Sequence, residues 1–203
     1  DFPRVSFCNY NPYKWSVVST DPDFVEIKEV AEYFYAGNMG TLKEKDPYGF
    51  YKETTTIGRT LRAQMWLRQI SAQMDPQTRL RATYSYDEMV SECRFRQATC
   101  NSSDFMGFLD PTFGQCYTFM KNYTMDRYGA ANGLRLILNV NQENPKTSYK
   151  AYDFLHSTES SGYRVSVHLA NRPPRFDDGA VDAATNKQTD VGVTRNVFNR
   201  ISR

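Results

Sequence analysis

Cysteines are the residues of this sequence whose chemistry is easiest to foresee. There are four, Cys8, Cys93, Cys100 and Cys116, and an even, low number in a chain of this size predicts two disulfides. Four cysteines allow three pairings, all of which stay open at this point. No Cys-x-x-Cys pair occurs and only two histidines are present, so we expect no metal site. Disulfides persist in oxidising compartments, which favours an extracellular or lumenal location.

Two triplets match the acceptor pattern for N-linked glycosylation, one starting at Asn101 and one at Asn122. About one such triplet is expected by chance in a chain of this length. Both lie inside or just beyond the cysteine cluster, and they indicate the same oxidising environment as the cysteines do. We therefore predict glycosylation at both asparagines.

Motifs of known catalytic chemistry are missing from the sequence, so we do not expect an enzyme. We find no Gly-x-Ser-x-Gly, His-Glu-x-x-His, Walker or Gly-x-Gly-x-x-Gly pattern, and no cofactor is indicated. His168 is better interpreted as a surface or hydrogen-bonded histidine than as a general base. Asp177 and Asp178 could bind calcium, but paired acids beside a turn are more often solvated. A carboxylate pair that meets only in the folded protein is left open.

Composition argues against two broad classes for these 203 residues. Lys+Arg 25 against Asp+Glu 23 leaves a net charge of +2, whereas nucleic-acid-binding domains normally carry a strong basic excess. No apolar run approaches the ~18–20 residues that cross a bilayer, so this stretch is not expected to span a membrane. No signal-peptide pattern opens the chain, and a secretion signal would have to lie outside it.

Hydrophobic periodicity predicts an α+β fold, with helices in the middle of the chain and strands at both ends. Apolar residues recur every three or four positions in two segments, and a capping-box pattern opens a third. The expected helices cover residues 21–36, 57–74 and 85–92. The expected strands cover residues 2–8, 134–140, 163–169 and 189–201. The helices therefore form a subdomain inserted into a sheet that is built from distant segments.

Charge is distributed unevenly along the expected helical part. Residues 21–53 hold eight acids and four lysines, a balance of −4, whereas residues 57–81 hold five arginines and one aspartate, a balance of +4. One interpretation is that two helices pack side by side with complementary faces. The other is that these are solvated faces that never meet, since a surface ion pair contributes only ~0–1 kcal/mol.

Five blocks of sequence share a pattern that goes beyond a single motif. They are Phe2-Pro3-Arg4-Val5-Ser6-Phe7-Cys8-Asn9-Tyr10-Asn11-Pro12, Cys93-Arg94-Phe95-Arg96 with Cys100, Phe113-Gly114-Gln115-Cys116-Tyr117-Thr118-Phe119, Gly133-Leu134-Arg135-Leu136, and Val165-Ser166-Val167-His168 with Pro173-Pro174. In type, order and cysteine spacing they resemble the extracellular part of the degenerin/epithelial sodium channel family, which includes the acid-sensing channels. The resemblance covers residues 2 to about 176 and is weaker over the last thirty.

The resemblance implies a fold and a disulfide pairing. It implies a mixed β-sheet palm and β-ball with an inserted helical finger, and it pairs Cys8 with Cys116 and Cys93 with Cys100. By this comparison residues 1–20 hold the first palm and β-ball strands, residues 21–92 the finger, and residues 93–203 the disulfide loop and the later strands. The family's thumb and its two membrane helices are not expected within these residues.

The resemblance also implies a function. Family members are homo- or hetero-trimeric, amiloride-sensitive sodium channels of the plasma membrane, so this chain would be the extracellular domain of one subunit. It would receive a stimulus and transmit it to a pore formed by segments outside this chain, through which sodium ions pass. Glu143, Asp153 and Glu159 stand near the family's proton-sensing acids, but the surrounding acid cluster is thinner, which leaves mechanical, proton, peptide or constitutive opening open. The alternative is a secreted or truncated glycosylated binding module without channel activity.

Overall fold

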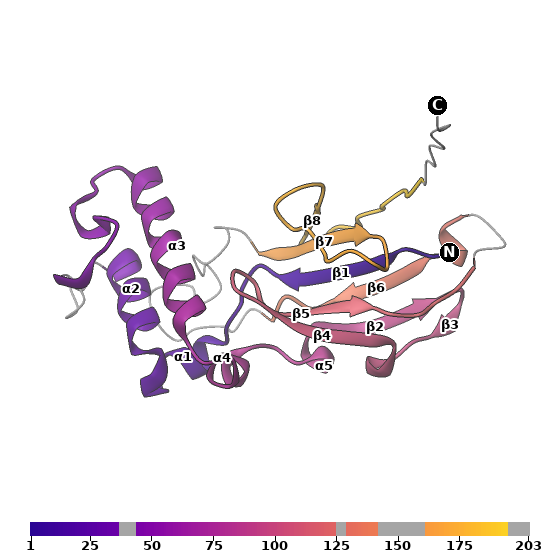
Figure 1. Ribbon diagram of the computed structural model, residues 1–203, viewed down its shortest axis with the longest axis horizontal. Helices are drawn as coiled ribbons and strands as arrows, with labels where there is room; N and C mark the ends of the chain where they lie inside the picture. The colour runs from indigo at the N-terminus through magenta and orange to yellow at the C-terminus, as the bar shows by residue number, and fades with distance from the viewer. Residues whose placement is uncertain (37–43, 125–128, 142–160, 195–203) are drawn as a thin grey trace, which may run out of the picture.

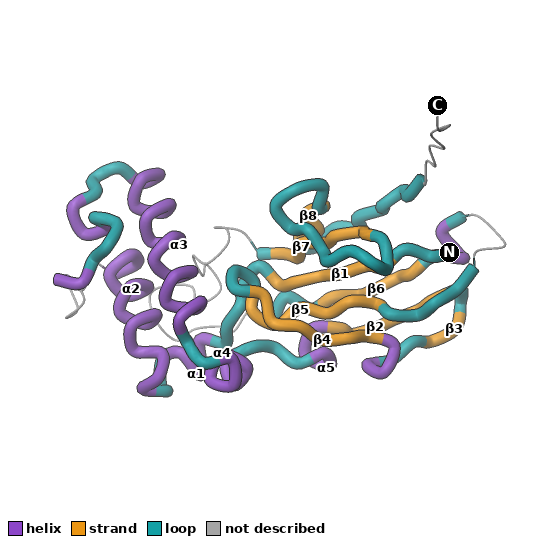
Figure 2. The backbone as a smooth tube through the Cα atoms, in the orientation of Figure 1, coloured by secondary structure: helices purple, strands orange, loops and turns teal. Residues whose placement is uncertain are grey.

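The computed structural model describes residues 1–36, 44–124, 129–141 and 161–194. Helices and strands separate into two ends of an elongated molecule (Figure 1), and colouring by secondary structure makes the division plain (Figure 2). The fold is a mixture of helices and two sheets, which confirms the predicted α+β class. Among the described residues, no helix combines the length and the apolar character that a bilayer crossing needs.

Two antiparallel sheets form one end of the molecule, which we call the sheet end. The larger sheet has the strand order β4-β5-β1-β7-β8 and the smaller one the order β3-β2-β6. The strands of the larger sheet are β1 (Arg4–Asn9), β4 (Phe105–Asp110), β5 (Gly114–Phe119), β7 (Gly162–His168) and β8 (Val181–Ala184). Those of the smaller sheet are β2 (Val90–Phe95), β3 (Ala98–Thr99) and β6 (Leu134–Leu138).

The first strand lies at the centre of the larger sheet. β1 pairs on one side with β5 and on the other with β7, so two segments from far along the chain hold it in place. Successive side chains of a strand point to opposite faces. Phe7 is fully buried and joins Phe119 and Tyr163 in an aromatic core with side chains of the smaller sheet, which places this core between the two sheets.

Helices form the other end, which we call the helical end. Its members are α1 (Trp15–Val18), the 3-10 turn η1 (Pro22–Phe24), α2 (Val25–Ala36), the 3-10 turn η3 (Phe50–Lys52), α3 (Thr56–Gln73) and α4 (Pro76–Ala82). Asp21 begins the first of the long segments by accepting the N–H of Asp23, and Thr55 begins α3 by accepting the N–H of Gly58. A separate core, which includes Phe24, Leu67 and Phe50, packs α2 against α3.

Two sequence-based predictions of secondary structure need correction. The helix predicted over 85–92 is the short α5 (Tyr86–Met89), and Val90 already begins β2, because this segment pairs with β6. The strand predicted over 189–201 is wrong for residues 189–194, which form none; its remainder lies outside the described residues. Among the described residues the last strand is β8, whose four residues pair with β7. A further helix, α4, starts at Pro76, where we expected only the end of α3.

Both disulfides lie within the sheet end. Cys8 and Cys116 stand directly opposite each other on β1 and β5, with Cα atoms 4.5 Å apart, and their bond closes a loop of 108 residues in sequence separation. Cys93 and Cys100 join β2 to the segment after β3, with a separation of seven residues. This is the pairing that the family resemblance implies. In the chain-entropy model the long loop stabilises the fold by about 4.8 kcal/mol and the short one by about 2.5 kcal/mol.

Candidate functional site

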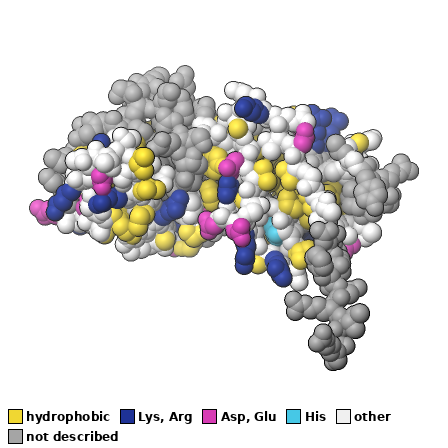
Figure 3. Space-filling view, turned by 90° about the horizontal axis from the view of Figure 1, so that it is seen from above, with side chains coloured by type: hydrophobic (Ala, Val, Ile, Leu, Met, Phe, Trp, Pro, Cys, Tyr) yellow, Lys and Arg dark blue, Asp and Glu magenta, His cyan; other side chains and the backbone are white. Residues whose placement is uncertain are grey.

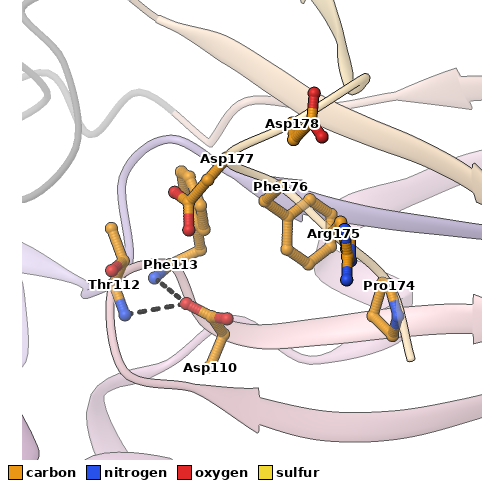
Figure 4. Close-up of a pocket in the computed structure, with 8 residues that line it drawn as sticks. All are labelled: Asp110, Thr112, Phe113, Pro174, Arg175, Phe176, Asp177 and Asp178. Carbon is orange, nitrogen blue, oxygen red and sulfur yellow. Dashed lines mark hydrogen bonds between the residues drawn. The ribbon is translucent and has the colours of Figure 1, made fainter. Parts of the chain in front are cut away.

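A pocket of about 350 Å³ lies where the β4–β5 turn meets the loop before β8 (Figure 4). Asp110 stabilises the β4–β5 turn, because its carboxylate accepts the N–H groups of Thr112 and Phe113 at 2.7 and 2.9 Å. Asp177 and Asp178 line the pocket from the other segment. Within the described part of the chain, no group of three or more His, Cys, Asp or Glu side chains could hold a metal ion.

His168 is the other residue that the sequence singled out for chemistry. Its Nε2 lies 2.8 Å from the hydroxyl of Ser6, and its Nδ1 lies 2.8 Å from the carbonyl oxygen of Arg172. Ser6 is fully buried and shares its hydroxyl with Thr118 at 2.7 Å, so a substrate could not reach it. Ser6 and His168 thus resemble a catalytic serine–histidine pair only in the distance between them. The interpretation of His168 as a hydrogen-bonded histidine is confirmed.

A network of amide and phenol groups lies at the end of β1, where the chain leaves the sheet end for the helices. Asn9 accepts the N–H of Asn11 at 2.9 Å and donates to the carbonyl oxygen of Val140 at 3.1 Å. Asn11 donates to the hydroxyl of Tyr84 at 3.1 Å, and that hydroxyl donates to the carbonyl oxygen of Asn141 at 3.4 Å. The end of β1 is thereby bound both to the segment after β6 and to the segment between α4 and α5. We call these residues the joint.

A second set of hydrogen bonds closes the joint on the sheet side. The hydroxyl of Tyr163, on β7, donates to the carbonyl oxygen of Asn139 at 2.6 Å. Asn141 donates from its side chain to the carbonyl oxygen of Glu88 in α5 at 2.5 Å. Burial raises the pKa of Tyr163 far above its ordinary value, so this phenol remains a neutral donor. A buried polar group that loses its partner costs about 1–3 kcal/mol, which gives the bond from Tyr163 structural weight, whereas the bond from Asn141 lies at the surface.

One ion pair adds to the joint at its surface. Lys14 pairs with Glu88 at 2.7 Å, and its backbone N–H donates to the carbonyl oxygen of Ala82 at 2.7 Å. Partial burial works to raise the pKa of Glu88, but hydrogen bonds from Lys14 and from Ser85 hold that pKa below its ordinary value. A pocket of about 430 Å³ opens beside this pair, lined by residues of α4, α5 and β5. The helical end and the sheet end therefore meet here through both charged and neutral contacts.

The acidic and basic segments of the helical end, for which two interpretations were open, meet through ion pairs. Arg81 binds Asp21 and Asp23 at 3.1 and 2.6 Å, and Arg62 binds Glu53 at 2.9 Å. These contacts join α3 and α4 to the turns that precede α2 and α3. The backbone N–H of Asp23, followed by the guanidinium of Arg81, lowers the pKa of Asp21. Because these groups are exposed, the pairs contribute little stability.

The two predicted glycosylation sites lie at the surface of the sheet end. Asn101 begins a short 3-10 turn, η4 (Ser102–Asp104), and accepts the hydroxyl of Ser103 at 2.7 Å. Asn122 follows β5 and accepts a hydrogen bond from Arg4 at 2.7 Å. Both asparagines are exposed. The predicted sensing residues, Glu143, Asp153 and Glu159, all lie outside the described residues.

Sequence reasoning missed the joint. The residues from Asn9 to Pro12 have the composition of a turn. Nothing near them in the sequence indicates their long-range hydrogen-bond partners, which are 73 to 131 positions away. Two asparagines with one residue between them, directly after a strand, were the only local signal. Such spacing fits an Asx-type turn, in which the first side chain accepts the N–H of the second, as Asn9 and Asn11 do here.

Comparison with known proteins gives this arrangement a context. The family model described as "Amiloride-sensitive sodium channel" matches residues 1–203. The chain belongs to this family. It is 32% identical over 203 residues to degenerin-like protein asic-2 of Caenorhabditis elegans, which covers 97% of this chain and 36% of that protein. It is 29% identical to degenerin unc-8 of the same organism, covering 95% of this chain and 23% of that protein.

A vertebrate relative extends the same likeness. The chain is 25% identical over 276 aligned positions to the epithelial sodium channel subunit gamma of Rattus norvegicus, covering 95% of this chain and 41% of that subunit. The chain thus spans well under half the length of these relatives. The amiloride-sensitive sodium channel family consists of ion channels, which supports interpreting the chain as part of a channel subunit and not as an enzyme.

Proposed function

We propose that this chain is the extracellular domain of one subunit of an amiloride-sensitive, sodium-selective channel, and that it transmits an external stimulus to the pore. The observation that carries the proposal is the match of the whole chain to the family model. The joint supports the second half of it. It binds the end of β1 to Tyr84, which follows α4 in the chain and packs in the core between the sheets, so a displacement of α4 would reach that strand through Tyr84.

β1 is well placed to pass such a displacement on. It starts at the end of the molecule opposite the helices and runs toward them (Figure 1). In the family the segment before this strand is the first membrane helix. A shift of α4 or α5 would act on Tyr84, then on Asn11, and so reach β1 and the segment that leads to the membrane. Since Cys8 is bonded to Cys116, β1 and β5 would move together.

The proposal includes partners and location. The subunit would lie in the plasma membrane with this domain on the extracellular side, in a homo- or hetero-trimer whose pore conducts sodium ions. Glu143, Asp153 and Glu159 are proposed stimulus-sensing residues. A carboxylate titrates near neutral pH only when burial or another acid raises its pKa. Because the neighbouring sequence holds Asn144-Pro145 and Tyr149-Lys150, a mechanical or peptide stimulus remains as compatible with the chain as a proton.

Current recording from the full-length subunit tests the proposal. Expressed alone and with sister subunits, it should carry a current that is larger in sodium than in potassium and is blocked by amiloride. The variant Asn11→Ala should change the stimulus dependence of that current while leaving its ion selectivity unaltered, because Asn11 belongs to the joint and not to the pore. Absence of current in every combination, with the protein present at the cell surface, would contradict the channel function.

N-glycosylation at Asn101 and Asn122 is a separate part of the proposal. Both side chains are exposed, and both retain a free amide nitrogen in the hydrogen bonds that the structure describes. Treatment of the cell-surface protein with a glycosidase that removes N-linked glycans should increase its gel mobility. The variants Asn101→Gln and Asn122→Gln should each remove one step of that shift. A protein whose mobility is unchanged by the enzyme is not glycosylated at either position.

A further inference from the structure

A pocket of about 430 Å³ lies beside the joint, where α4 ends and α5 begins. Its volume falls within the range of about 300–1,000 Å³ that is usual for sites of small ligands. Its lining includes three apolar or aromatic side chains and three charged ones, namely Leu80, Tyr84 and Tyr117, and Lys14, Arg81 and Glu88. Rings combined with a few polar groups are typical of a site that binds a small molecule.

Hydrogen-bonding capacity in the pocket is left over on the donor side. Glu88 is the one acid among the described lining residues, and both of its oxygens are used. Its Oε1 pairs with Lys14 at 2.7 Å, and its Oε2 accepts the backbone N–H and the hydroxyl of Ser85 at 2.7 and 2.8 Å. Lys14 has three N–H groups for this one carboxylate. Its Nζ also lies 5.7 Å from the centre of the Tyr84 ring, which places the charge beside the apolar wall.

Arg81 has donors left over as well. Its ion pairs with Asp21 and Asp23 are both made by Nη2. The N–H groups of Nε and Nη1 therefore have no partner among the described residues, and a guanidinium presents such donors in a planar fork that matches a carboxylate. Asp21 and Asp23 do not line the pocket, but they share the charge of Arg81, so the affinity for an anion should be modest.

We propose that this pocket binds a small monocarboxylate that carries a flat apolar group. The carboxylate accepts hydrogen bonds from Lys14 and Arg81, and the apolar group packs on the rings of Tyr84 and Tyr117. A cation would meet only Glu88, whose oxygens are already occupied. A doubly charged anion would bring more charge than two cations that are already paired can balance.

A broad field of one sign is not the basis of this recognition. On the face shown in Figure 3, basic and acidic side chains are interspersed over both ends of the molecule. The net charge of the chain is only +2. Selectivity for a carboxylate must therefore come from contacts within the pocket, and substitutions of single residues can test it.

A ligand in this pocket acts on the joint. The side chain of Tyr84 lines the pocket, while its hydroxyl accepts from Asn11 and donates to the carbonyl oxygen of Asn141. A ligand packed against the ring restricts the side chain through which these bonds are made. This regulatory part rests on the proposed function, whereas the binding part does not. Because a ligand shifts an equilibrium only by the difference between its affinities for the two states, binding and regulation are measured separately.

Protection of a thiol measures binding in the full-length subunit without requiring any channel current. Leu80 lines the pocket and is 38% exposed, so Leu80→Cys places a reactive thiol there. The native cysteines of this chain are all in disulfides, and labelling is measured above the signal of the unmutated subunit. Gln73→Cys is the matched control, since Gln73 is exposed on α3 and does not line the pocket. A membrane-impermeant thiol reagent applied to cells should label the two positions at rates within about fivefold of each other.

Hydrocinnamate is the probe, because it joins one carboxylate to one phenyl ring. It should slow labelling at position 80, with half-protection at about 1–10 mM as expected for a ligand of this size, and should leave position 73 unaffected. Hydrocinnamide has the same shape without the charge, and acetate has the charge without the ring. Each of these two should need at least about tenfold more for the same protection.

Charge variants distinguish recognition of a carboxylate from a general disturbance of the joint. In the Leu80→Cys background, Lys14→Gln should raise the half-protecting concentration by about fivefold or more, and Lys14→Arg should restore it. Glu88→Gln should lower that concentration by about threefold or more, because the ligand no longer competes with Glu88 for Lys14. Both Lys14→Gln and Glu88→Gln break the same ion pair, so a purely structural role of the pair would shift protection in the same direction.

Four results would overturn the binding part. They are no protection by about 50 mM hydrocinnamate, equal protection by hydrocinnamide, shifts of the same sign in Lys14→Gln and Glu88→Gln, and labelling at position 80 that is more than about tenfold slower than at 73 without any probe. The last would mean that another part of the protein already fills the pocket.

Current recording tests the regulatory part. Hydrocinnamate at about ten times its half-protecting concentration should shift the stimulus dependence of the unmutated channel and leave that of Lys14→Gln nearly unchanged. Protection of the thiol without any such shift would refute regulation through the joint. Absence of current in every subunit combination would contradict the channel function, and the protection of the thiol would still stand as evidence of binding.

Discussion

The two ends of the molecule are stabilised in different ways. At the sheet end β1 is held by strands and by a disulfide partner that lie more than a hundred residues away along the chain. At the helical end the packing is local, between α2 and α3 and the short turns that flank them, and neither disulfide is present. Long-range, cross-linked contacts resist local opening, whereas a small core of local contacts allows it. Stability and the capacity to move are therefore concentrated in different regions.

The largest effect is expected when the Cys8–Cys116 disulfide, which closes the loop that contains the helices, is removed. The double variant Cys8→Ala/Cys116→Ala should lower the free energy of unfolding by about 4–5 kcal/mol, because the unfolded chain regains the entropy of a long loop. Cys93→Ala/Cys100→Ala, which frees a seven-residue separation, is the matched control and should cost about 2–3 kcal/mol. Denaturant unfolding of the purified, oxidised protein measures both. Equal losses of stability in the two double variants would show that the stabilisation by a disulfide does not depend here on the length of the loop it closes.

A cavity in the helical core should affect that end alone. Leu67 is fully buried, so Leu67→Ala should lower the free energy of unfolding of the helical end by about 2–5 kcal/mol. Leu61→Ala, on the same helix but exposed, should change it by less than about 0.5 kcal/mol in this chain. Amide hydrogen exchange should become faster in α2 and α3 and stay unchanged in β1, β5 and β7. Faster exchange throughout the sheets would mean that the two ends unfold as one unit.

A substitution in the joint should cause a loss of stability of intermediate size. Tyr84→Phe removes a hydroxyl that accepts from Asn11 and donates to the carbonyl oxygen of Asn141, and it should cost about 1–2 kcal/mol. Tyr86→Phe is the matched control, since the buried hydroxyl of Tyr86 has no hydrogen-bond partner among the described residues and its loss should be neutral. Denaturant unfolding measures the stability of both variants. In the full-length channel only Tyr84→Phe should alter the response to the stimulus. An equal effect of both variants would contradict a role of the joint in transmitting the stimulus.

Sequence reasoning succeeded for elements whose signal is local. The periodicity of α2 and α3, and the alternation in β6 and β7, placed these elements to within a few residues, because each buries one face along its own length. It failed where one residue pair serves two purposes. The sequence predicted a helix over 57–74 and none directly after it, but Asp75 and Pro76, which end that helix, also cap and start α4. The segment after Met89 was extended as a helix because its pairing with β6 depends on residues more than forty positions away.

The joint lay beyond what sequence patterns could indicate. Apart from the turn between Asn9 and Asn11, its hydrogen bonds join asparagine and tyrosine side chains to groups of distant segments, and no spacing rule relates them. The disulfide pairing was also open from composition, and only the resemblance to a family distinguished Cys8–Cys116 from the other possibilities. Contacts of this kind are properties of the assembled tertiary structure, so they become visible only when the two ends have been placed together.

The smallest expected effect concerns the ion pair at the surface of the joint. Because the folded state lowers the pKa of Glu88, its contribution to stability is complete above the unfolded pKa, near 4.5, and is lost as the pH falls through the lower folded value. The Glu88 side chain is 42% exposed, so Glu88→Gln should cost less than about 1 kcal/mol at neutral pH and nothing at a pH below the folded pKa. Lys14→Met should produce the same loss, and the double variant no more than either single one. Denaturant unfolding between pH 2 and 7 measures this. If Glu88→Gln instead cost more than Tyr84→Phe, charge and not the buried amide and phenol groups would hold the two ends together, and the joint would weaken with salt.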